Sequence, residues 1–375
     1  MIVESLIEAI DRGRQGKAQG YSIGLPKLEQ VIDGVCKGTY YLCGAESGVG
    51  KSSFMLYSFI YRPLMEHLDD NKFRISLFSL EMNSEMIMAK LLSTYIFETY
   101  KKRLSLKQLL SAQKGFILND ECYEIVKKCI PWMKKVEAIL TIYDKNASAN
   151  SIYSHILKEL ESRGKFEESE KRKIYIPNDP DLIHLVVIDH IARIFPTQGN
   201  TLKQEMDLAS KYLYSLKNRC GITPVVIQQL NRGIQGMDRR REGMVTPSTA
   251  DYKDTNSTIE DAEIVLAIFS PNRLKLNTHR GYDIKQLGDR MRSIFVLKSR
   301  YGESDVEDFI YYDGKCNKWT ELNKFYNLCK FCNLIKPYLH NWAYYKIQRG
   351  GSKLRESENV QNPLDNSNPS FAEMH

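Results

Sequence analysis

The sequence lacks the features of a membrane or secreted protein. No apolar run approaches the roughly 20 residues that a helix needs to cross a bilayer, and the first residues, MIVESLIEAIDRGRQ, lack the apolar core of a signal peptide. The eight cysteines are scattered, without the regular spacing of a disulfide framework. These absences predict a cytoplasmic protein with reduced thiols and no membrane partner.

The composition is that of a globular protein. The chain has 375 residues, 42% of them hydrophobic and 26% charged, enough for one large domain with appendages or for two small ones. The net charge of +7 permits a nucleic-acid partner but does not require one, because a modest basic excess also keeps proteins soluble. No internal repeat is visible.

Short apolar runs alternate with helical stretches from residue 39 onward. The strands that we expect are Thr39–Cys43, Arg74–Leu80, Leu140–Tyr143, His184–Ile188, Pro224–Ile227, Ile264–Phe269 and Ser293–Leu297, followed by a hairpin over 307–322. Continuous apolar runs, in place of strict alternation, indicate strands that are buried on both faces. The pattern therefore predicts an α/β fold with a mainly parallel sheet flanked by helices.

The segments outside this pattern suggest four appendages to a main domain over 20–323. Apolar residues at helical spacing predict a linker helix within 1–19, and dense mixed charge with two prolines predicts a surface insertion over 159–182. Aromatic residues interleaved with Lys and Arg form a C-terminal extension over 324–351. The final segment, 352–375, is rich in Ser, Asn, Pro and Glu, which predicts a disordered tail.

A strand, a glycine-rich turn and an apolar helix follow one another in YYLCGAESGVGKSSFMLYSFI. The turn fits a P-loop that has Ala in place of its first Gly. Gly48 and Gly50 allow backbone N–H groups to crowd around a phosphate, and a helix beginning near Lys51 adds its positive dipole end. A chance glycine-rich turn is the alternative, but the flanking strand and helix favour a P-loop. The predicted nucleotide-binding residues are Ala45, Glu46, Ser47, Gly48, Val49, Gly50, Lys51, Ser52 and Ser53.

Such a site also needs a carboxylate near the metal and a base for water. Lys51 would reach the β- and γ-phosphates, and the Ser52 hydroxyl would ligate Mg²⁺. Asp189 ends the apolar run HLVVI and suits a hydrogen bond to a Mg²⁺-bound water, while Glu81 follows another strand and suits a general base. Each carboxylate alone has the alternative of capping a strand end; together with the P-loop, the functional interpretation is stronger.

The ordered motifs resemble the RecA-like motor domain of DnaB-type hexameric replicative helicases, a family of RecA-like P-loop NTPases. The resemblance covers about 20–323. It rests on GLPKLEQVIDGVCKGTYYLCGAESGVGKSS, FSLEM, VVIDH, ITPVVIQQLNRG, ADYKDTNSTIEDAEIVLAI and FVLKSRYGE. It implies ATP and Mg²⁺ as cofactors, single-stranded DNA as partner and assembly into a homo-oligomer, expected as a hexameric ring. A primase or a loader protein is a further candidate partner.

The resemblance also assigns roles to single residues. It implies that Glu81 is the catalytic glutamate, that Asp189 belongs to the Walker B motif, and that Gln229 senses the γ-phosphate. It further implies that Lys298 and Arg300 act on the nucleotide of the neighbouring subunit. Independently, two cations two residues apart at a strand end point to the same side and suit a finger inserted from an adjacent protomer, although a solvated strand end is the alternative.

The DNA-contacting loop departs from the family pattern, because Lys253-Asp254-Thr255-Asn256 stands where the family has Arg-Glu-Ser-Gly. Three arginines precede it and would track a single-stranded backbone by charge, although a solvated charge cluster is the alternative. The predicted DNA-binding residues are Arg239, Arg240, Arg241, Lys253, Asp254 and Asn256. The large N-terminal domain of the family, which recruits primase, is also missing, and this suggests a phage or mobile-element version.

Two other classes remain open: a RecA/RadA-like recombination ATPase that forms filaments on DNA, and a non-catalytic ATP-binding loader or scaffold. Glu81 argues against the second. The C-terminal extension could stack on bases or dock on a partner. Cys329, Cys332 and His340 suggest zinc only weakly, since a second cysteine pair is absent, and a helix packed on the motor is the interpretation that we favour.

Overall fold

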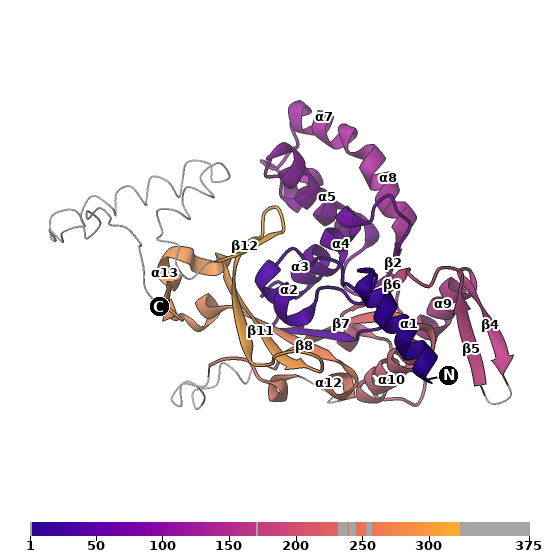
Figure 1. The fold of residues 1–375 in the computed structure, drawn as a ribbon. Helices are drawn as coiled ribbons and strands as arrows, with labels where there is room; N and C mark the ends of the chain where they lie inside the picture. The colour runs from indigo at the N-terminus through magenta and orange to yellow at the C-terminus, as the bar shows by residue number, and fades with distance from the viewer. Residues whose placement is uncertain (1, 170–171, 232–238, 240–244, 253–256, 323–375) are drawn as a thin grey trace, which may run out of the picture. The chain divides into compact units, whose positions relative to one another are not determined.

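A nine-stranded sheet forms the centre of the computed structural model (Figure 1). The structure describes residues 2–169, 172–231, 239, 245–252 and 257–322, all of which belong to one compact unit, Met1–Lys324. The sheet has the strand order β13-β12-β11-β8-β1-β7-β6-β2-β3. The strands are β1 Tyr41–Ala45, β2 Phe73–Ser79, β3 Leu140–Tyr143, β6 Ile183–Asp189, β7 Thr223–Gln229, β8 Ile264–Phe269, β11 Met291–Ser299, β12 Val306–Asp313 and β13 Lys318–Glu321.

The strands from β8 to β3 are all parallel to their neighbours, whereas β11, β12 and β13 are antiparallel and close one side of the sheet. The predicted α/β class with a mainly parallel sheet is therefore confirmed. Every predicted strand overlaps an observed one, and the hairpin over 307–322 is β12 and β13. The continuous apolar runs have the expected cause, because β1, β6 and β8 are buried along their whole length.

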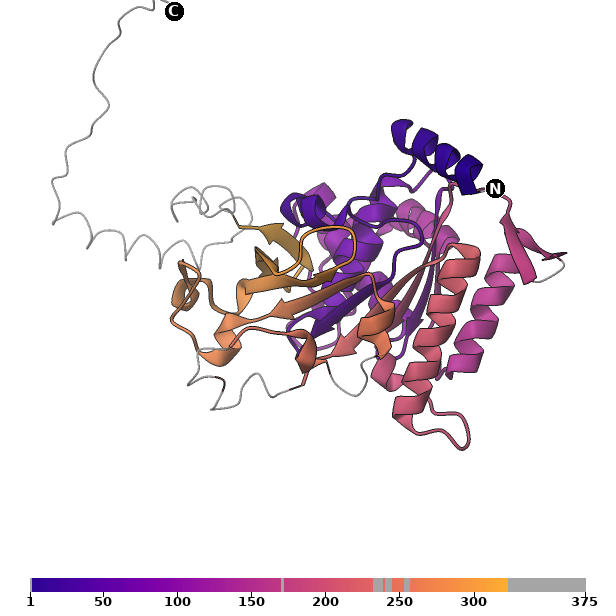
Figure 2. The same ribbon diagram turned by 60° about the horizontal axis from the view of Figure 1, so that its bottom comes forward.

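Helices cover both faces of the sheet, and side chains of successive strand residues alternate between two cores. Tyr41 and Cys43 belong to the core beneath the helices of one face, while Leu42 belongs to the core of the other. The first face carries α2 Pro26–Ile32, α3 Lys51–Phe54, the π-helix η1 Met55–Tyr61, α4 Arg62–Glu66, α5 Ser84–Tyr100 and α8 Ile130–Ile139. The second carries α9 Ala149–Glu161 and α10 Leu202–Cys220, which lie side by side in Figure 2.

Two structured segments were not foreseen from the sequence. The chain between β2 and β3 is helical and extends from the sheet through α5, α6 Leu106–Leu109, α7 Asp120–Lys128 and α8 (Figure 1). The segment 159–182, expected as a charged surface insertion, contains the antiparallel strands β4 Gly164–Ser169 and β5 Arg172–Pro177. The ring of Phe166 lies 5.1 Å from that of Tyr175, and both pack against the core that contains α9 and α10, so this hairpin is anchored to the body.

The remaining elements are short, apart from the N-terminal helix α1 Ile2–Arg14, which lies within the segment 1–19 where the spacing predicts a helix. They are η2 Ile191–Arg193, η4 Thr249–Asp251, α12 Ser257–Asp261, η5 Pro271–Leu274, β9 Thr278–His279, β10 Tyr282–Asp283, α13 Ile284–Leu287 and η6 Gly288–Arg290. Within the described part of the chain, no helix is long and apolar enough to cross a membrane.

The cysteines in the described residues are free thiols, and no group of His, Cys, Asp or Glu in the same residues could hold a metal ion on its own. The predicted C-terminal extension and tail, with Cys329, Cys332 and His340, lie outside the described residues.

Candidate nucleotide-binding site

The carboxyl ends of four neighbouring strands bring the predicted site residues to one edge of the sheet. Ala45, the last residue of β1, is paired with Gln229 at the end of β7, and Ser79 at the end of β2 is paired with Asp189 at the end of β6. Glu81 follows β2 by two residues. Ligands of open α/β sheets bind at this carboxyl edge, so the fold places these side chains where the sequence predicted them.

The P-loop turns between β1 and α3 as the sequence predicted. Gly48 has φ of 73° and Gly50 has φ of 114°, conformations that residues with a Cβ rarely adopt. The helix begins at Lys51, whose side chain is buried, and continues through η1 and α4 to Glu66. Gly44, expected to keep the turn permissive, lies inside β1, where an added Cβ would be 2.6 Å from the ring of Tyr252.

Ser52 and Asp189 form a pair of oxygen ligands beside the P-loop. The Ser52 hydroxyl donates to Asp189 Oδ1 over 3.0 Å, while Asp189 Oδ2 is buried and finds no hydrogen-bond donor among the described residues. Burial raises the pKa of Asp189 to about 6, although Ser52 and Lys51 oppose the rise. A buried carboxylate oxygen without a partner, next to a hydroxyl, fits a hard divalent cation such as Mg²⁺. By contrast, the hydroxyl of Ser53 accepts from Lys90 of α5.

Glu81 is surrounded by cationic and imidazole groups. Its carboxylate lies 3.9 Å from Lys51 Nζ, 3.0 Å from His190 Nε2 and 3.4 Å from Arg193 Nε. Burial acts to raise the pKa of Glu81, but His190 and Lys51 outweigh it and hold the pKa below its usual value. Glu81 is therefore ionised at neutral pH. Neither His190 nor Arg193 was singled out from the sequence, although His190 directly follows Asp189.

Lys298 and Arg300 lie at the opposite edge of the sheet. Because β11 is antiparallel to β8, Lys298 pairs with Val265 near the beginning of β8, whereas the P-loop adjoins the strand ends. The Lys298 ammonium group donates to the carbonyl of Ile259 over 2.7 Å. The Arg300 guanidinium group lies 3.3 Å from Glu263 Oε1 and is 43% exposed, so part of it remains accessible.

Of the predicted DNA-binding residues, only Arg239 is described. Its guanidinium group pairs with Asp251 and donates to the carbonyl of Thr246 over 2.8 Å. This arginine thus contributes to the local structure of its loop. The other residues of this prediction, Arg240, Arg241, Lys253, Asp254 and Asn256, lie outside the described residues.

Two arginines that the sequence did not suggest contact the P-loop from the side of β8 and β11. Arg273 donates to the carbonyl of Ser47 over 2.6 Å, and Arg292 donates to the carbonyl of Val49 over 2.7 Å. Both are more than 220 residues from their partners in sequence. No local pattern in the sequence marks either of them.

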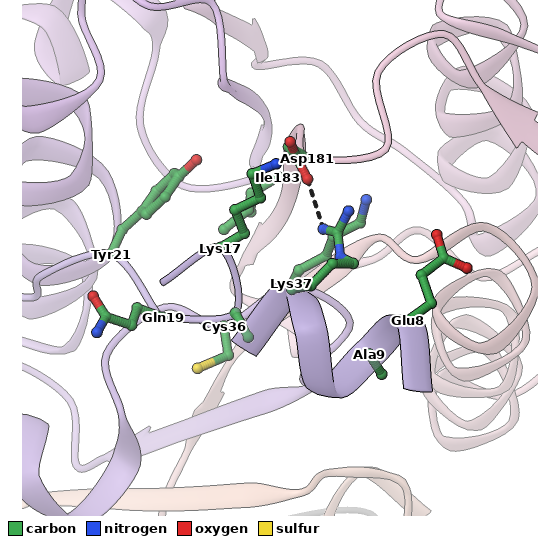
Figure 3. A pocket seen from close by; sticks show the side chains of 11 residues that line it. Glu8, Ala9, Lys17, Gln19, Tyr21, Cys36, Lys37, Asp181 and Ile183 are labelled. Atoms are coloured by element: carbon green, nitrogen blue, oxygen red, sulfur yellow. Dashed lines mark ion pairs between the residues drawn. The ribbon is translucent and has the colours of Figure 1, made fainter. Parts of the chain in front are cut away.

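A cavity of about 410 Å³ lies elsewhere, between α1 and the beginning of the main domain. Glu8, Lys17 and Tyr21 line it, and an ion pair of 2.7 Å between Arg12 and Asp181 closes one side (Figure 3). The lining includes none of the P-loop, Glu81 or Asp189. The cavity is therefore separate from the candidate site.

A parallel sheet whose central strand enters a P-loop and a helix, with carboxylates at the ends of the adjacent strands, defines a RecA-like P-loop NTPase fold. A model of the DnaB-like helicase C-terminal domain matches residues 20–321, and the chain belongs to this family. The family expected from the motifs is thus confirmed.

Curated relatives and solved structures agree with the family. The chain is 24% identical over 327 residues to the replicative DNA helicase DnaB of Helicobacter pylori (strain J99), which covers 86% of this chain and 56% of the relative. It is 24% identical over 285 residues to that of Buchnera aphidicola subsp. Baizongia pistaciae, with 76% and 52% covered. The chain spans about half the length of the curated relatives it matches.

Among solved structures, an isolated ATPase domain has a TM-score of 0.65 at 16% identity, covering 86% of this chain and 99% of that one. A DnaB-like replicative helicase, described with its interactions with primase, has a TM-score of 0.64 at 16% identity, covering 86% and 69%. At these identities the likeness establishes the fold.

Proposed function

We propose that the protein is an ATP-driven DNA helicase motor that forms a ring and translocates on single-stranded DNA. The observation that carries this proposal is the separation of two sets of predicted site residues. Lys51, Ser52 and Asp189 gather at the carboxyl edge of the sheet, while Lys298 and Arg300 lie at the other edge, about 16 Å away by the length of β8. The second set therefore suits a nucleotide on a neighbouring copy.

In this proposal the carboxyl-edge residues bind the nucleotide and prepare water for attack. The residues Ala45 to Ser53 would surround the phosphates, with Lys51 at the β- and γ-phosphates. Ser52 and Asp189 would hold Mg²⁺, Asp189 through a water, and the metal would neutralise phosphate charge. Glu81, ionised and held by His190, would take the proton of the attacking water.

Gln229 and the opposite edge would link hydrolysis to assembly. Gln229 ends the strand beside the P-loop strand, which suits a sensor of the γ-phosphate. The Arg300 guanidinium group is part-exposed on a surface distant from its own P-loop. A cation supplied by a neighbour stabilises charge that develops in phosphoryl transfer, and it makes turnover depend on oligomerisation.

The outward face of α1 supports contact between copies. Val3, Leu6, Ile7 and Ile10 are each about half exposed or more, although apolar side chains at helical spacing are normally covered. We assign the linker to 1–19, the motor to 20–323, the basic-aromatic extension to 324–351 and the tail to 352–375. The six predicted DNA-binding residues and a primase or loader partner belong to the same proposal.

Mixing two inactive variants tests the shared site. Lys51→Ala removes the cation at the phosphates, and Arg300→Ala removes the proposed cation from the neighbour while leaving nucleotide binding intact. Each alone should lose ATP hydrolysis, and a mixture should recover part of it, because some interfaces then pair an intact P-loop with an intact Arg300. Arg280→Ala is the matched control, since Arg280 is also an exposed arginine with a carboxylate partner, Glu307.

Full activity of Arg300→Ala alone, or a wild-type monomer that hydrolyses ATP at the assembled rate, would contradict the role in trans. Electron microscopy with ATP and single-stranded DNA then separates closed rings from the filaments of a recombination ATPase. A protein that binds ATP without turnover in any assembly would instead be a loader or scaffold.

A further inference from the structure

We infer that Arg273 and Arg292 are positioning residues of the P-loop, which hold the carbonyl groups of Ser47 and Val49 and thereby aim the following N–H groups at the phosphates. The inference rests on the proposed nucleotide site and deepens it. It assigns the shape of the phosphate cradle to side chains from the other end of the domain, in addition to the glycines of the motif.

The geometry of the peptide group gives this contact its consequence. A trans peptide is planar, and its C=O and N–H bonds point in opposite directions. When the Ser47 carbonyl is held on the outside of the loop, the N–H of Gly48 points to the inside, and Val49 and Gly50 are related in the same way. Successive N–H groups directed into one concavity form an anion-binding nest. The arginines hold alternate peptide groups, which fixes the path of the loop between them.

Arg292 has the environment of a fixed anchor. Its side chain is 1% exposed, and Nε donates to Val49 O over 2.7 Å. The other nitrogens donate to the carbonyl of Asp289 over 2.7 Å and to that of Met291 over 2.8 Å, and one lies 3.3 Å from the Asp289 carboxylate. The ring of Tyr312 lies 5.4 Å from the guanidinium carbon. Because these partners hold the group in one plane, Val49 O is held in place as well.

Arg273 holds the outer part of the loop from η5. Its Nη1 donates to Ser47 O over 2.6 Å, and a Cβ added at Gly48 would lie 2.4 Å from its Nη2. Gly48 therefore needs to be glycine for two reasons, its positive φ and the close approach of this guanidinium group. The side chain of Arg273 is exposed, unlike that of Arg292. Its substitution therefore changes the loop contact with little effect on the core.

A loop that is already in its binding conformation spends less of its interaction energy on ordering. Loss of one charge-assisted hydrogen bond should weaken binding by about tenfold. The effect belongs to the bound and free equilibrium of the phosphates, so it should appear in the affinity for ADP and in KM for ATP, and kcat should change little.

The test compares Arg273→Gln with Arg280→Gln in the full chain. Both variants remove one exposed arginine from the segment between β8 and β11, but only the first contacts the P-loop. Arg273→Gln should weaken ADP binding about tenfold, with an unchanged thermal midpoint and faster amide hydrogen exchange over residues 46–50 in the absence of nucleotide. Arg280→Gln should match the wild type in all of these. Arg292→Lys, which keeps the charge but cannot reproduce the planar fork, should also weaken ADP binding.

Wild-type affinity for ADP in Arg273→Gln would overturn the inference, as would equal losses in both glutamine variants, which would indicate a general effect of charge. A loss confined to kcat would overturn it too, because that result places Arg273 at the transition state and not at the loop. Failure of the wild type itself to bind ADP would contradict the proposed nucleotide site, and it is thereby distinguished from failure of this inference.

Discussion

Replacement of Asp189 with asparagine measures how much stability the candidate site loses by holding an ionised carboxylate. Asp189 is fully buried, and its pKa rises from 3.8 to about 6. Each tenfold change in proton affinity corresponds to about 1.4 kcal/mol, so ionised Asp189 costs the folded state about 3 kcal/mol at pH 8. We expect Asp189→Asn to raise the free energy of unfolding of the metal-free protein by up to that amount. The gain is an upper bound, because the amide nitrogen of asparagine takes the place of the oxygen that has no donor.

The pH dependence gives the sign of this effect. Between pH 3.8 and pH 6 the folded state keeps a proton on Asp189 that the unfolded state has lost, so the stability of the wild type falls as the pH rises through this range. The difference between variant and wild type should therefore roughly double from pH 5 to pH 8.

Urea unfolding in the presence of EDTA checks this expectation. Asp179→Asn serves as the opposite control, because the ammonium group of Lys72, 2.6 Å from Asp179, holds the pKa of that carboxyl below its usual value. Asp179→Asn should lower the stability at pH 8. An Asp189→Asn variant less stable than the wild type at pH 8, or a difference that does not change with pH, would refute the reasoning.

Two further substitutions test the base and the strand before the P-loop. Glu81→Gln should bind ATP as the wild type does but lose hydrolysis by a factor on the order of 10²–10⁴, measured as turnover beside nucleotide affinity; a wild-type rate would remove Glu81 from the role of base. Gly44→Ala should lower the free energy of unfolding by about 1–3 kcal/mol, because the new Cβ would be 2.6 Å from the ring of Tyr252. An unchanged urea midpoint for this variant would show that the ring moves aside at little cost.

The sheet and the carboxyl-edge residues could be predicted because their signals are local. A strand buried on both faces must be apolar along its length, and β6 and β8 are read directly from such runs. A P-loop needs its glycines and its lysine within one turn, so Gly48, Gly50 and Lys51 are adjacent in the sequence as well as in space. The parallel sheet then brings Asp189 to the same edge without further information.

The residues that the sequence did not reveal depend on contacts between distant segments. Arg273 and Arg292 reach the P-loop across more than 220 residues, and arginines at the surface or in a strand carry no signal of such a partner. The helical segment from α5 to α8 was missed for a different reason. Helix α5 has apolar residues around much of its circumference, since it is packed between neighbours, and the pattern of one apolar face is lost.

The two edges of the sheet carry complementary halves of the proposed site, and this limits how copies can assemble. A contact that places Arg300 of one copy beside Lys51 of the next uses a different surface on each copy and is therefore head-to-tail. Such a contact closes into a ring when the rotation between neighbours divides a full turn, and otherwise it continues as a filament. The residues at the interface are the same in both cases. Substitutions of Lys51, Glu81 and Arg300 therefore test whether the site is shared, while the rotation between neighbours, which electron microscopy measures, decides between the replicative ring and the recombination filament.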